Sequence, residues 1–186
     1  MRKILVTGAY STGKTTLVGE LSRALVSKGV RVNVLPDVAR ESPAPLNENQ
    51  TDEASIWLAS VQISREIAAG FRESDVLLCD RGVPDILAHH QDVEEGRRGG
   101  RVALMRPFLE DWIRSYDRIL FSRIDHSIPI AEDEIRVPTN SYRMRMELRA
   151  ERVLRDVPSV KVLPIDREER LRYALGIIFE SLASEP

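Results

Sequence analysis

The sequence predicts an α/β fold in which helices cover both faces of a five-stranded parallel sheet. Three observations lead to this prediction. Five short apolar segments alternate with helical patterns along the 186 residues, which is typical of βαβ units. Two of these segments, 3–7 and 76–79, are short, largely apolar runs, as expected for strands buried on both faces. A glycine-rich motif lies at the first junction between strand and helix.

The first half of the chain contains three predicted strands. Residues 3–7 form the first, and the helix after it has leucines at helical spacing until Gly29 offers a stop. Alternating valines predict a second strand over 30–34. Thr51 or Asp52 can cap the next helix, which should reach about Arg72. Its expected buried face comprises Ile56, Ala59, Ile63, Ile67 and Phe71.

The second half begins with the predicted strand 76–79, after which Pro84 suits the start of a short helix that reaches Gln91. A helix over 102–115 follows, and its expected core face comprises Leu104, Phe108, Leu109 and Trp112. The remaining predicted elements are a strand at 118–122, an irregular segment at 125–140, an arginine-dense helix at 141–155, a strand at 160–164 and a last amphipathic helix.

The glycine-rich motif at 8–15 matches the phosphate-loop pattern G-x-x-x-x-G-K-[ST] at every fixed position. Its glycines allow consecutive N–H groups to turn toward phosphate oxygens, beside the positive end of a helix. Lys14 would reach the β- and γ-phosphates of ATP, and the Thr15 hydroxyl would bind Mg²⁺. The predicted nucleotide-binding residues are Gly8, Ala9, Tyr10, Ser11, Thr12, Gly13, Lys14, Thr15 and Thr16.

Further polar residues follow the predicted strands, at the edge of the sheet where ligands of such folds bind. This edge should bring Asp37, Asp80, Arg81 and Asp125 close to the phosphate loop. Asp80 ends an apolar strand, as does the carboxylate that orients Mg²⁺ in phosphate-loop proteins. The alternative for Asp80 is a cap of the next helix.

Two of these residues have competing interpretations. Arg81 is either a clamp on a transferred or acceptor phosphate or part of a surface ion pair. Asp37 ends the second strand, which we expect to lie next to the first. Its carboxylate can accept a proton from an attacking hydroxyl, or it is a turn residue after proline.

A lid is expected over residues 125–150. Arg136, Arg143 and Arg145 lie in this region, where a closing segment can neutralise transition-state charge. The alternative is a helix whose arginines form surface salt bridges with Glu147 and Glu151. The histidines at 89, 90 and 126 lack ligand spacing, and no metal is assigned to them.

Composition limits the classes of function. The formal net charge of -2 gives no overall basic surface for nucleic acid, and the only compact basic cluster is Arg97, Arg98 and Arg101. The single cysteine excludes an internal disulfide. No apolar run approaches the roughly 18 residues of a membrane span, and the N-terminus enters the first strand without a signal peptide. We therefore expect one cytoplasmic domain over 1–186.

These motifs give most of the chain a resemblance to small P-loop kinases of the NadR ribosylnicotinamide-kinase type and to the wider group of predicted ATP-binding kinases. Segments 8–17, 37–41, 80–85 and 133–136 carry it. The Asp80-Arg81 pair is also similar to that of thymidylate and deoxynucleoside kinases. The resemblance implies a three-layer P-loop sandwich with an arginine-bearing lid. It also implies that Asp37 binds or deprotonates the acceptor hydroxyl, and that Arg136 is the lid arginine.

The sequence departs from the family pattern at two positions. Asp37 stands where glutamate is frequent, and Glu134 stands where glycine is common. The first substitution shortens the proposed acceptor-side carboxylate, and the second changes the backbone freedom of the lid.

Together these features predict a kinase that uses ATP and Mg²⁺ to phosphorylate a small nucleoside-like or related metabolite. Asp37, Arg40 and Arg81 would bind the acceptor, Thr15 and Asp80 the metal, and Lys14, Asp37, Arg81 and Arg136 would act in catalysis. The alternatives are a regulatory ATP-binding module and a kinase of polynucleotide ends. A GTPase is less favoured because there is no Asn-Lys-x-Asp signature. The acceptor and the oligomeric state stay open.

Overall fold

The computed structural model describes residues 1–94, 100–127, 129–130 and 139–184. Within them, five parallel strands form one sheet in the order β2-β3-β1-β4-β5. The strands are β1 (Arg2–Thr7), β2 (Val32–Leu35), β3 (Val76–Asp80), β4 (Arg118–Phe121) and β5 (Val160–Val162). The predicted five-stranded parallel sheet is confirmed.

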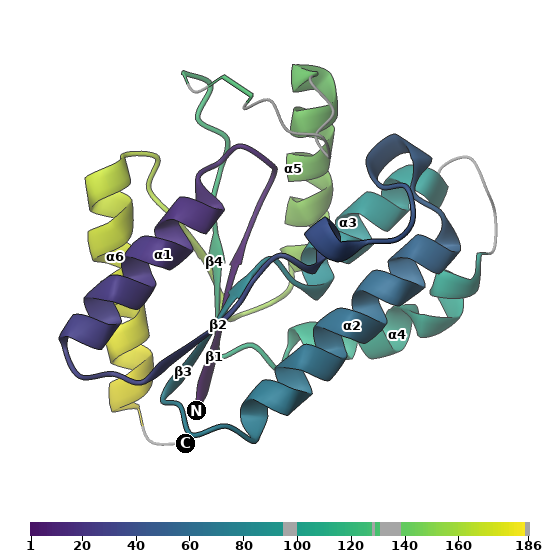
Figure 1. The fold of residues 1–186 in the computed structure, drawn as a ribbon. Coiled ribbons are helices and arrows are strands. Elements are labelled where there is room, and N and C mark those ends of the chain that lie inside the picture. Colours follow the sequence, from purple (N-terminus) through teal and green to yellow (C-terminus); the bar gives the residue numbers. More distant parts are fainter. Residues whose placement is uncertain (95–99, 128, 131–138, 185–186) are drawn as a thin grey trace.

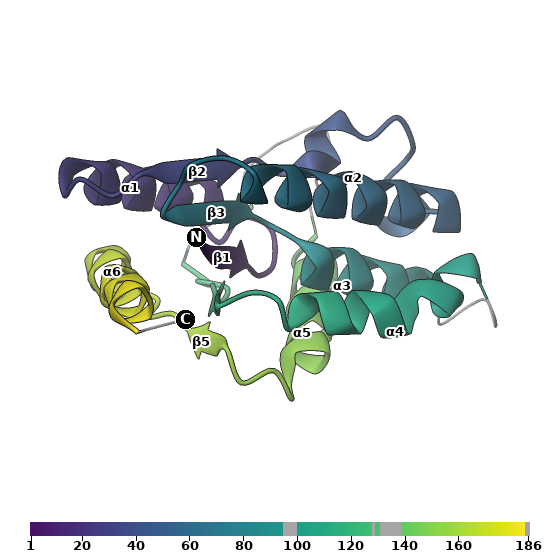
Figure 2. The same ribbon diagram turned by 90° about the horizontal axis from the view of Figure 1, so that it is seen from below.

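In the described part of the chain, six α-helices cover the sheet and give the expected three layers (Figures 1 and 2). One face packs against α1 (Lys14–Ser27) and α6 (Arg167–Ala183). The opposite face packs against α2 (Asp52–Gly70), α3 (Val83–Glu94), α4 (Arg101–Ile113) and α5 (Asn140–Leu154). Two short 3-10 turns, Val38–Glu41 and Asn47–Asn49, connect β2 to α2.

Residues along β1 alternate between the two faces of the sheet, so each face has its own apolar core. Leu5 packs in the cluster beneath α2 to α5, whereas Ile4 and Val6 pack in the cluster beneath α1 and α6. All three side chains are fully buried. This central strand leads directly into the phosphate loop and fixes the base of that loop.

The sheet order corrects one expectation. The second strand does not lie next to the first, because β3 pairs with both β1 and β2 and separates them. Consequently β2 occupies an edge of the sheet. Asp37 follows β2, so β3 separates the strand before Asp37 from β1, the strand that leads into the phosphate loop. Pairing between distant strands depends on the whole chain, which local sequence patterns do not encode.

The expected buried faces of α2 and α4 are partly wrong. Ile67 and Phe71 are 48% and 88% exposed, and Leu104 and Phe108 are 86% and 51% exposed. In α2 the buried face includes three polar side chains, those of Ser55, Gln62 and Glu66. In α4 it includes Val102 and Ile113 beside the expected Leu109. Apolar periodicity assigns polar positions to the solvent, so it placed the face of α2 incorrectly.

The described part of the chain contains no helix that combines the length and the apolar character needed to cross a membrane.

Candidate active site

The phosphate loop connects the end of β1 to the start of α1, and its glycines are required by its geometry. Gly8 has a φ of 135°, and a Cβ atom there would lie 2.2 Å from the carbonyl oxygen of Ser122. Gly13 has a φ of 78°, in the left-handed region. The loop thus packs against the chain that follows β4 too closely for a side chain at position 8.

Buried donors from α5, α6 and the chain after β4 hold the carbonyl groups of this loop. Arg143 of α5 donates through Nε to the Tyr10 carbonyl at 3.2 Å and through Nη2 to the Ser11 carbonyl at 2.7 Å. Arg170 of α6 and the Ser122 hydroxyl both donate to the Thr12 carbonyl, at 2.8 and 3.1 Å. In a trans peptide the N–H points opposite to the C=O, so the following amide groups face away from these donors.

The arginines predicted for the lid differ in their surroundings. Arg143 is only 2% exposed and lies beneath the loop, rather than on a mobile surface. Arg145 forms an ion pair of 3.5 Å with Glu48 and lies over the Tyr142 ring. Arg136 lies outside the described residues, as do Arg97 and Arg98 of the basic cluster.

Glu147 and Glu151 of α5 were expected to form surface salt bridges with the arginines of the predicted lid, but they have other partners. Glu147 accepts the backbone N–H of Ile124 at 2.6 Å, and Glu151 pairs with Arg123 at 2.8 Å. These two acidic residues of α5 thus bind the chain after β4.

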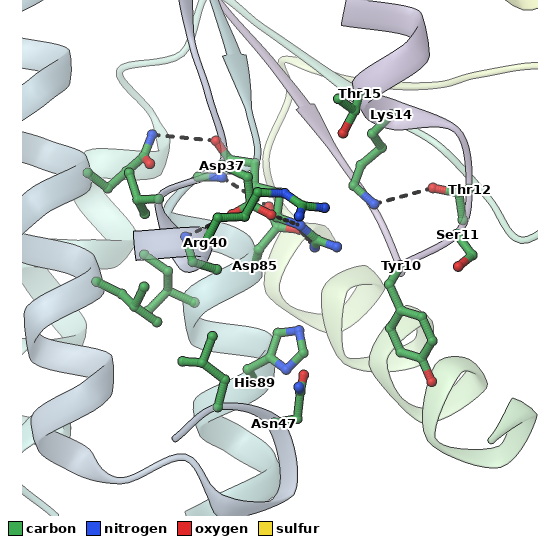
Figure 3. A pocket seen from close by; sticks show the side chains of 18 of the residues that line it. Tyr10, Ser11, Thr12, Lys14, Thr15, Asp37, Arg40, Asn47, Asp85 and His89 are labelled. Carbon is green, nitrogen blue, oxygen red and sulfur yellow. Dashed lines mark hydrogen bonds and ion pairs between the residues drawn. The ribbon is translucent and has the colours of Figure 1, made fainter. Parts of the chain in front are cut away.

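Lys14 extends into the curve of the phosphate loop (Figure 3). Its Nζ donates to the Ala9 carbonyl at 2.5 Å and to the Thr12 hydroxyl oxygen at 3.4 Å. Burial, and then repulsion from Arg81, lowers the pKa of Lys14 to about 7. A polyanion bound in the loop would favour the charged form of this amine.

Asp80 and Thr15 meet although they lie 65 positions apart in the sequence. The Thr15 hydroxyl donates to Oδ2 of Asp80 at 2.6 Å. Burial raises the pKa of Asp80 above its usual value, and the Thr15 hydrogen bond opposes this shift. The carboxylate at the start of α3 is that of Asp85, which accepts the Gly82 N–H at 3.1 Å. The helix start thus uses Asp85 where the cap alternative required Asp80.

Arg81 lies between two carboxylates. Its Nε is 3.0 Å from Oδ2 of Asp37, and its Nη1 is 2.9 Å from Oδ1 of Asp85. Burial favours its neutral form, but the carboxylates of Asp85 and Asp37 outweigh burial and raise the pKa of Arg81. Its backbone has a φ of 72°, which is unusual for arginine. The expected ion pair is therefore present, but it lies in the wall of a cavity and not on the outer surface.

Asp37 has a second contact, because its carboxylate accepts the Ala39 N–H at 3.0 Å and begins the first 3-10 turn. The geometry therefore supports the interpretation of Asp37 as a turn residue. Because Asp37 also lines the cavity, it can contact an acceptor from the same position. Its side chain is 12% exposed in the ion pair with Arg81.

One cavity of about 330 Å³ joins these groups (Figure 3). The phosphate loop from Tyr10 to Thr16 lines one side, and Asp37, Arg40 and Arg81 line the other. Asp80 and Asp125 are outside the lining, although Asp80 contacts Thr15 within it. The sequence-based prediction missed five polar lining residues: Asn47, Gln50, Gln62, Asp85 and His89. Only Asp85 had a local signal, its helical spacing from Arg81.

Comparisons with known proteins agree with this architecture. A family model described as an AAA domain matches residues 3–170. A search of curated proteins finds no significant match. Among solved structures, a deoxyadenosine kinase from M. mycoides with bound dATP has a TM-score of 0.71 and 14% sequence identity, and the alignment covers 96% of this chain and 100% of the kinase.

Two structures of the NadR protein are similarly close in fold. The complex with NR has a TM-score of 0.69 at 20% identity, and the complex with NAD and AMP-PNP has 0.66 at 18%. The alignments cover 99% and 100% of this chain, which spans only 51% and 50% of the NadR chains. The expected likeness to P-loop kinases of this kind is thus confirmed at the level of the fold.

Proposed function

This chain belongs to the AAA domain family, and we propose that it is a phosphotransferase. It would move the γ-phosphate of ATP to a hydroxyl or phosphate of a small nucleoside-like or related metabolite. The observation that carries the proposal is the single cavity between the phosphate loop and the Asp37–Arg81 pair. A site for nucleotide binding alone has no need of this second, largely apolar half. The bound nucleotides of the NadR and deoxyadenosine kinase structures support the choice.

The residues of the phosphate loop fit ATP, and Thr15 with Asp80 fits Mg²⁺. A hydroxyl and a carboxylate in contact at 2.6 Å are the hard oxygen ligands that Mg²⁺ prefers. Bound Mg²⁺ would neutralise phosphate charge. Lys14 would bind the β- and γ-phosphates, while Arg143 and Arg170 keep the loop carbonyls away from them.

On the acceptor side, we assign Asp37 to binding or deprotonating the attacking hydroxyl and Arg40 to binding the acceptor. Arg81 would hold Asp37 in place through the 3.0 Å ion pair and would contact phosphate as it transfers. The proposal also includes a lid over residues 125–150, in which Arg136 would be the catalytic arginine. It also includes the single domain over 1–186 and, on the basis of cysteine use, a cytoplasmic location.

The test is release of ADP from ATP by the purified protein, screened against nucleosides, nucleotides and other metabolites. The proposal expects at least one small acceptor to raise ADP release and to appear as a phosphorylated product by mass spectrometry. Nucleotide binding with slow hydrolysis that no acceptor stimulates would contradict it and favour the regulatory module. Phosphorylation of DNA or RNA ends alone would favour the polynucleotide kinase.

A further inference from the structure

Asp85 on α3 binds three donors at the point where the phosphate loop begins. Its Oδ1 accepts from Nη1 of Arg81 at 2.9 Å. Its Oδ2 accepts from the Thr7 hydroxyl at 2.8 Å and from the Gly82 N–H at 3.1 Å. The side chain is 7% exposed and lies in the cavity wall (Figure 3). Both oxygens of this buried carboxylate are therefore used to hold other groups in place.

The Arg81 guanidinium lies where the Asp85 carboxylate and the phosphate loop meet. Its Nη1 is shared between Oδ1 of Asp85 and the Gly8 carbonyl, at 2.9 and 3.4 Å. The backbone N–H of Arg81 donates to the Val6 carbonyl at 3.0 Å, so the main chain of this residue also docks on the end of β1. A free arginine side chain samples many rotamers, and these contacts confine it before a nucleotide binds.

The two carboxylate partners of Arg81 differ in how they are held. Asp37 follows β2 at the edge of the sheet, where the Ala39 N–H of a short turn binds it. Asp85 is bound to Thr7 at the end of β1, the central strand of the sheet. An acceptor that contacts Asp37 competes with the Asp37–Arg81 ion pair. The pair with Asp85 would then keep the guanidinium in place.

We propose that Asp85 is a positioning residue for phosphoryl transfer, which holds the Arg81 guanidinium at the base of the phosphate loop so that its charge meets the transferred phosphate. The inference rests on the proposed function. A charge stabilises a transition state best when it is oriented before the reaction begins, because no ordering is then required during the reaction. Asp85 therefore acts through Arg81 and not through a contact of its own with the substrate.

The test is a double-mutant cycle on Arg81 and Asp85, measured by steady-state phosphorylation of an acceptor found in the screen. Asp85→Asn removes the charge and keeps the size of the side chain. It should lower kcat roughly tenfold to a hundredfold, as expected for one lost contact to a charged group, while KM for ATP stays within a few fold. Arg81→Met should lower kcat at least as much. The double variant should be no slower than Arg81→Met, because without Arg81 nothing remains for Asp85 to position.

Asp117→Asn is the matched control, at the opposite end of β1. There Asp117 accepts from Nη1 of Arg2 at 3.2 Å and from the Lys3 N–H at 2.7 Å, so it binds a guanidinium and a backbone N–H as Asp85 does. This variant should lower the melting temperature and leave kcat unchanged. Asp85→Gln is a second neutral variant, which keeps an acceptor for the Gly82 N–H at the start of α3 and replaces Asp85→Asn if that protein does not fold.

NMR of the Arg81 guanidinium gives a measurement that does not depend on activity. Its signals are assigned by their absence in Arg81→Met. Their N–H protons should exchange slowly with water in the ligand-free wild-type protein and faster in the neutral Asp85 variants, because a held guanidinium keeps its hydrogen bonds. Fast exchange in the wild type, or equal rates in wild type and variants, would contradict the positioning role.

Losses of kcat that add in the double variant would overturn the inference, because they would show that Asp85 acts independently of Arg81. Wild-type kcat in a neutral Asp85 variant or in Arg81→Met would do so as well. The proposed function fails separately, if no acceptor is phosphorylated. In that case the NMR comparison and the same cycle, measured on the hydrolysis of ATP, still decide the role of Asp85.

Discussion

The hydroxyl of Thr15 donates a 2.6 Å hydrogen bond to the carboxylate of Asp80, and so joins the first turn of α1 to the end of β3. The two residues come from different elements, yet their oxygen atoms are already side by side. A pair of adjacent hard oxygen ligands requires little rearrangement to bind a divalent cation beside a polyphosphate.

The first prediction concerns this pair. Asp80→Asn should lower Mg²⁺-dependent turnover at least about tenfold, because a hydrogen bond or contact to a charged group is worth roughly 1.5–3 kcal/mol. Nucleotide binding without metal should change far less. Asp75→Asn is the control, since Asp75 precedes β3, pairs with Arg31 away from the cavity and should leave Mg²⁺-dependent turnover unchanged. Equal losses of Mg²⁺-dependent turnover and of metal-free nucleotide binding in Asp80→Asn would indicate a structural role for Asp80.

The second prediction concerns the lysine of the phosphate loop. Lys14→Ala should leave the fold intact. It should weaken ATP binding or turnover at least about tenfold, because the variant lacks the charged contact between this amine and phosphate. Lys161→Ala, which changes an exposed lysine of β5, should have no such effect. Titration calorimetry and circular dichroism measure both properties. Wild-type affinity and turnover in a folded Lys14→Ala protein would remove the basis of the phosphate-loop assignment.

The third prediction concerns pH. The pKa of Lys14 is lowered to about 7 in the ligand-free protein, and bound polyphosphate should raise it. ATP binding near pH 8 should therefore take up a proton, and affinity should fall as the pH rises from about 6 to 9. Calorimetry in buffers of different ionisation enthalpy measures this uptake. Lys14→Met should abolish it, and an unchanged uptake in that variant would assign the proton to another group.

The same shift has a consequence for stability. A lysine binds fewer protons in the folded than in the unfolded state when its folded pKa is the lower of the two. The unfolding free energy should thus rise with pH between about 7 and 10, where the folded protein no longer holds this proton. The rise should be absent in Lys14→Met.

The fourth prediction concerns Asp37. Asp37→Asn should lower acceptor phosphorylation by roughly 10²–10⁴, the usual contribution of a general base, while ATP affinity stays within a few fold. Hydrolysis of ATP by water should largely survive. Glu41→Gln changes another acidic residue of the same 3-10 turn, which pairs with Arg65, and should leave phosphorylation unchanged. Single-turnover kinetics with and without acceptor decide the matter, and wild-type transfer by Asp37→Asn would make Asp37 a turn residue only.

The fifth prediction concerns Arg143, whose guanidinium binds the Tyr10 and Ser11 carbonyls from below. Arg143→Met should lower the free energy of unfolding by roughly 1.5–3 kcal/mol and weaken ATP binding, because the loop amides lose their fixed orientation. Arg145→Met removes a partly exposed ion pair and should cost less than about 1 kcal/mol. Denaturant titration tests both. Undiminished ATP binding by Arg143→Met would show that the loop holds its shape unaided.

The elements and the phosphate loop were predictable because their signals are local. The glycine positions, the apolar run of β1 and the Thr51 cap each depend on a few neighbouring residues, and the structure contains all of them. Asp37 and Arg81 were also placed on one edge correctly, because the carboxyl ends of parallel strands meet there.

The contacts that shape the site were not predictable in this way. Arg143 and Tyr10 lie 133 positions apart, and the sequence around either residue contains no local pattern that predicts their contact. Gln62 and Glu66 lie on the buried face of α2, where apolar periodicity expects no polar residue. Their burial is possible only because donors from β1, α4 and the turn after it surround the carboxylate.

The edge position of β2 has an evolutionary consequence. The segment after β2 supplies much of the acceptor side of the cavity, yet this strand has a single neighbour in the sheet. A lineage can therefore lengthen or replace this segment with little disturbance to β1, β3 and β4, from which the phosphate loop and Asp80 extend. Under the proposed function, variation in this segment would change the acceptor and leave the phosphate donor unchanged. A mutant library restricted to residues 38–50 is the corresponding route to new acceptors in the laboratory.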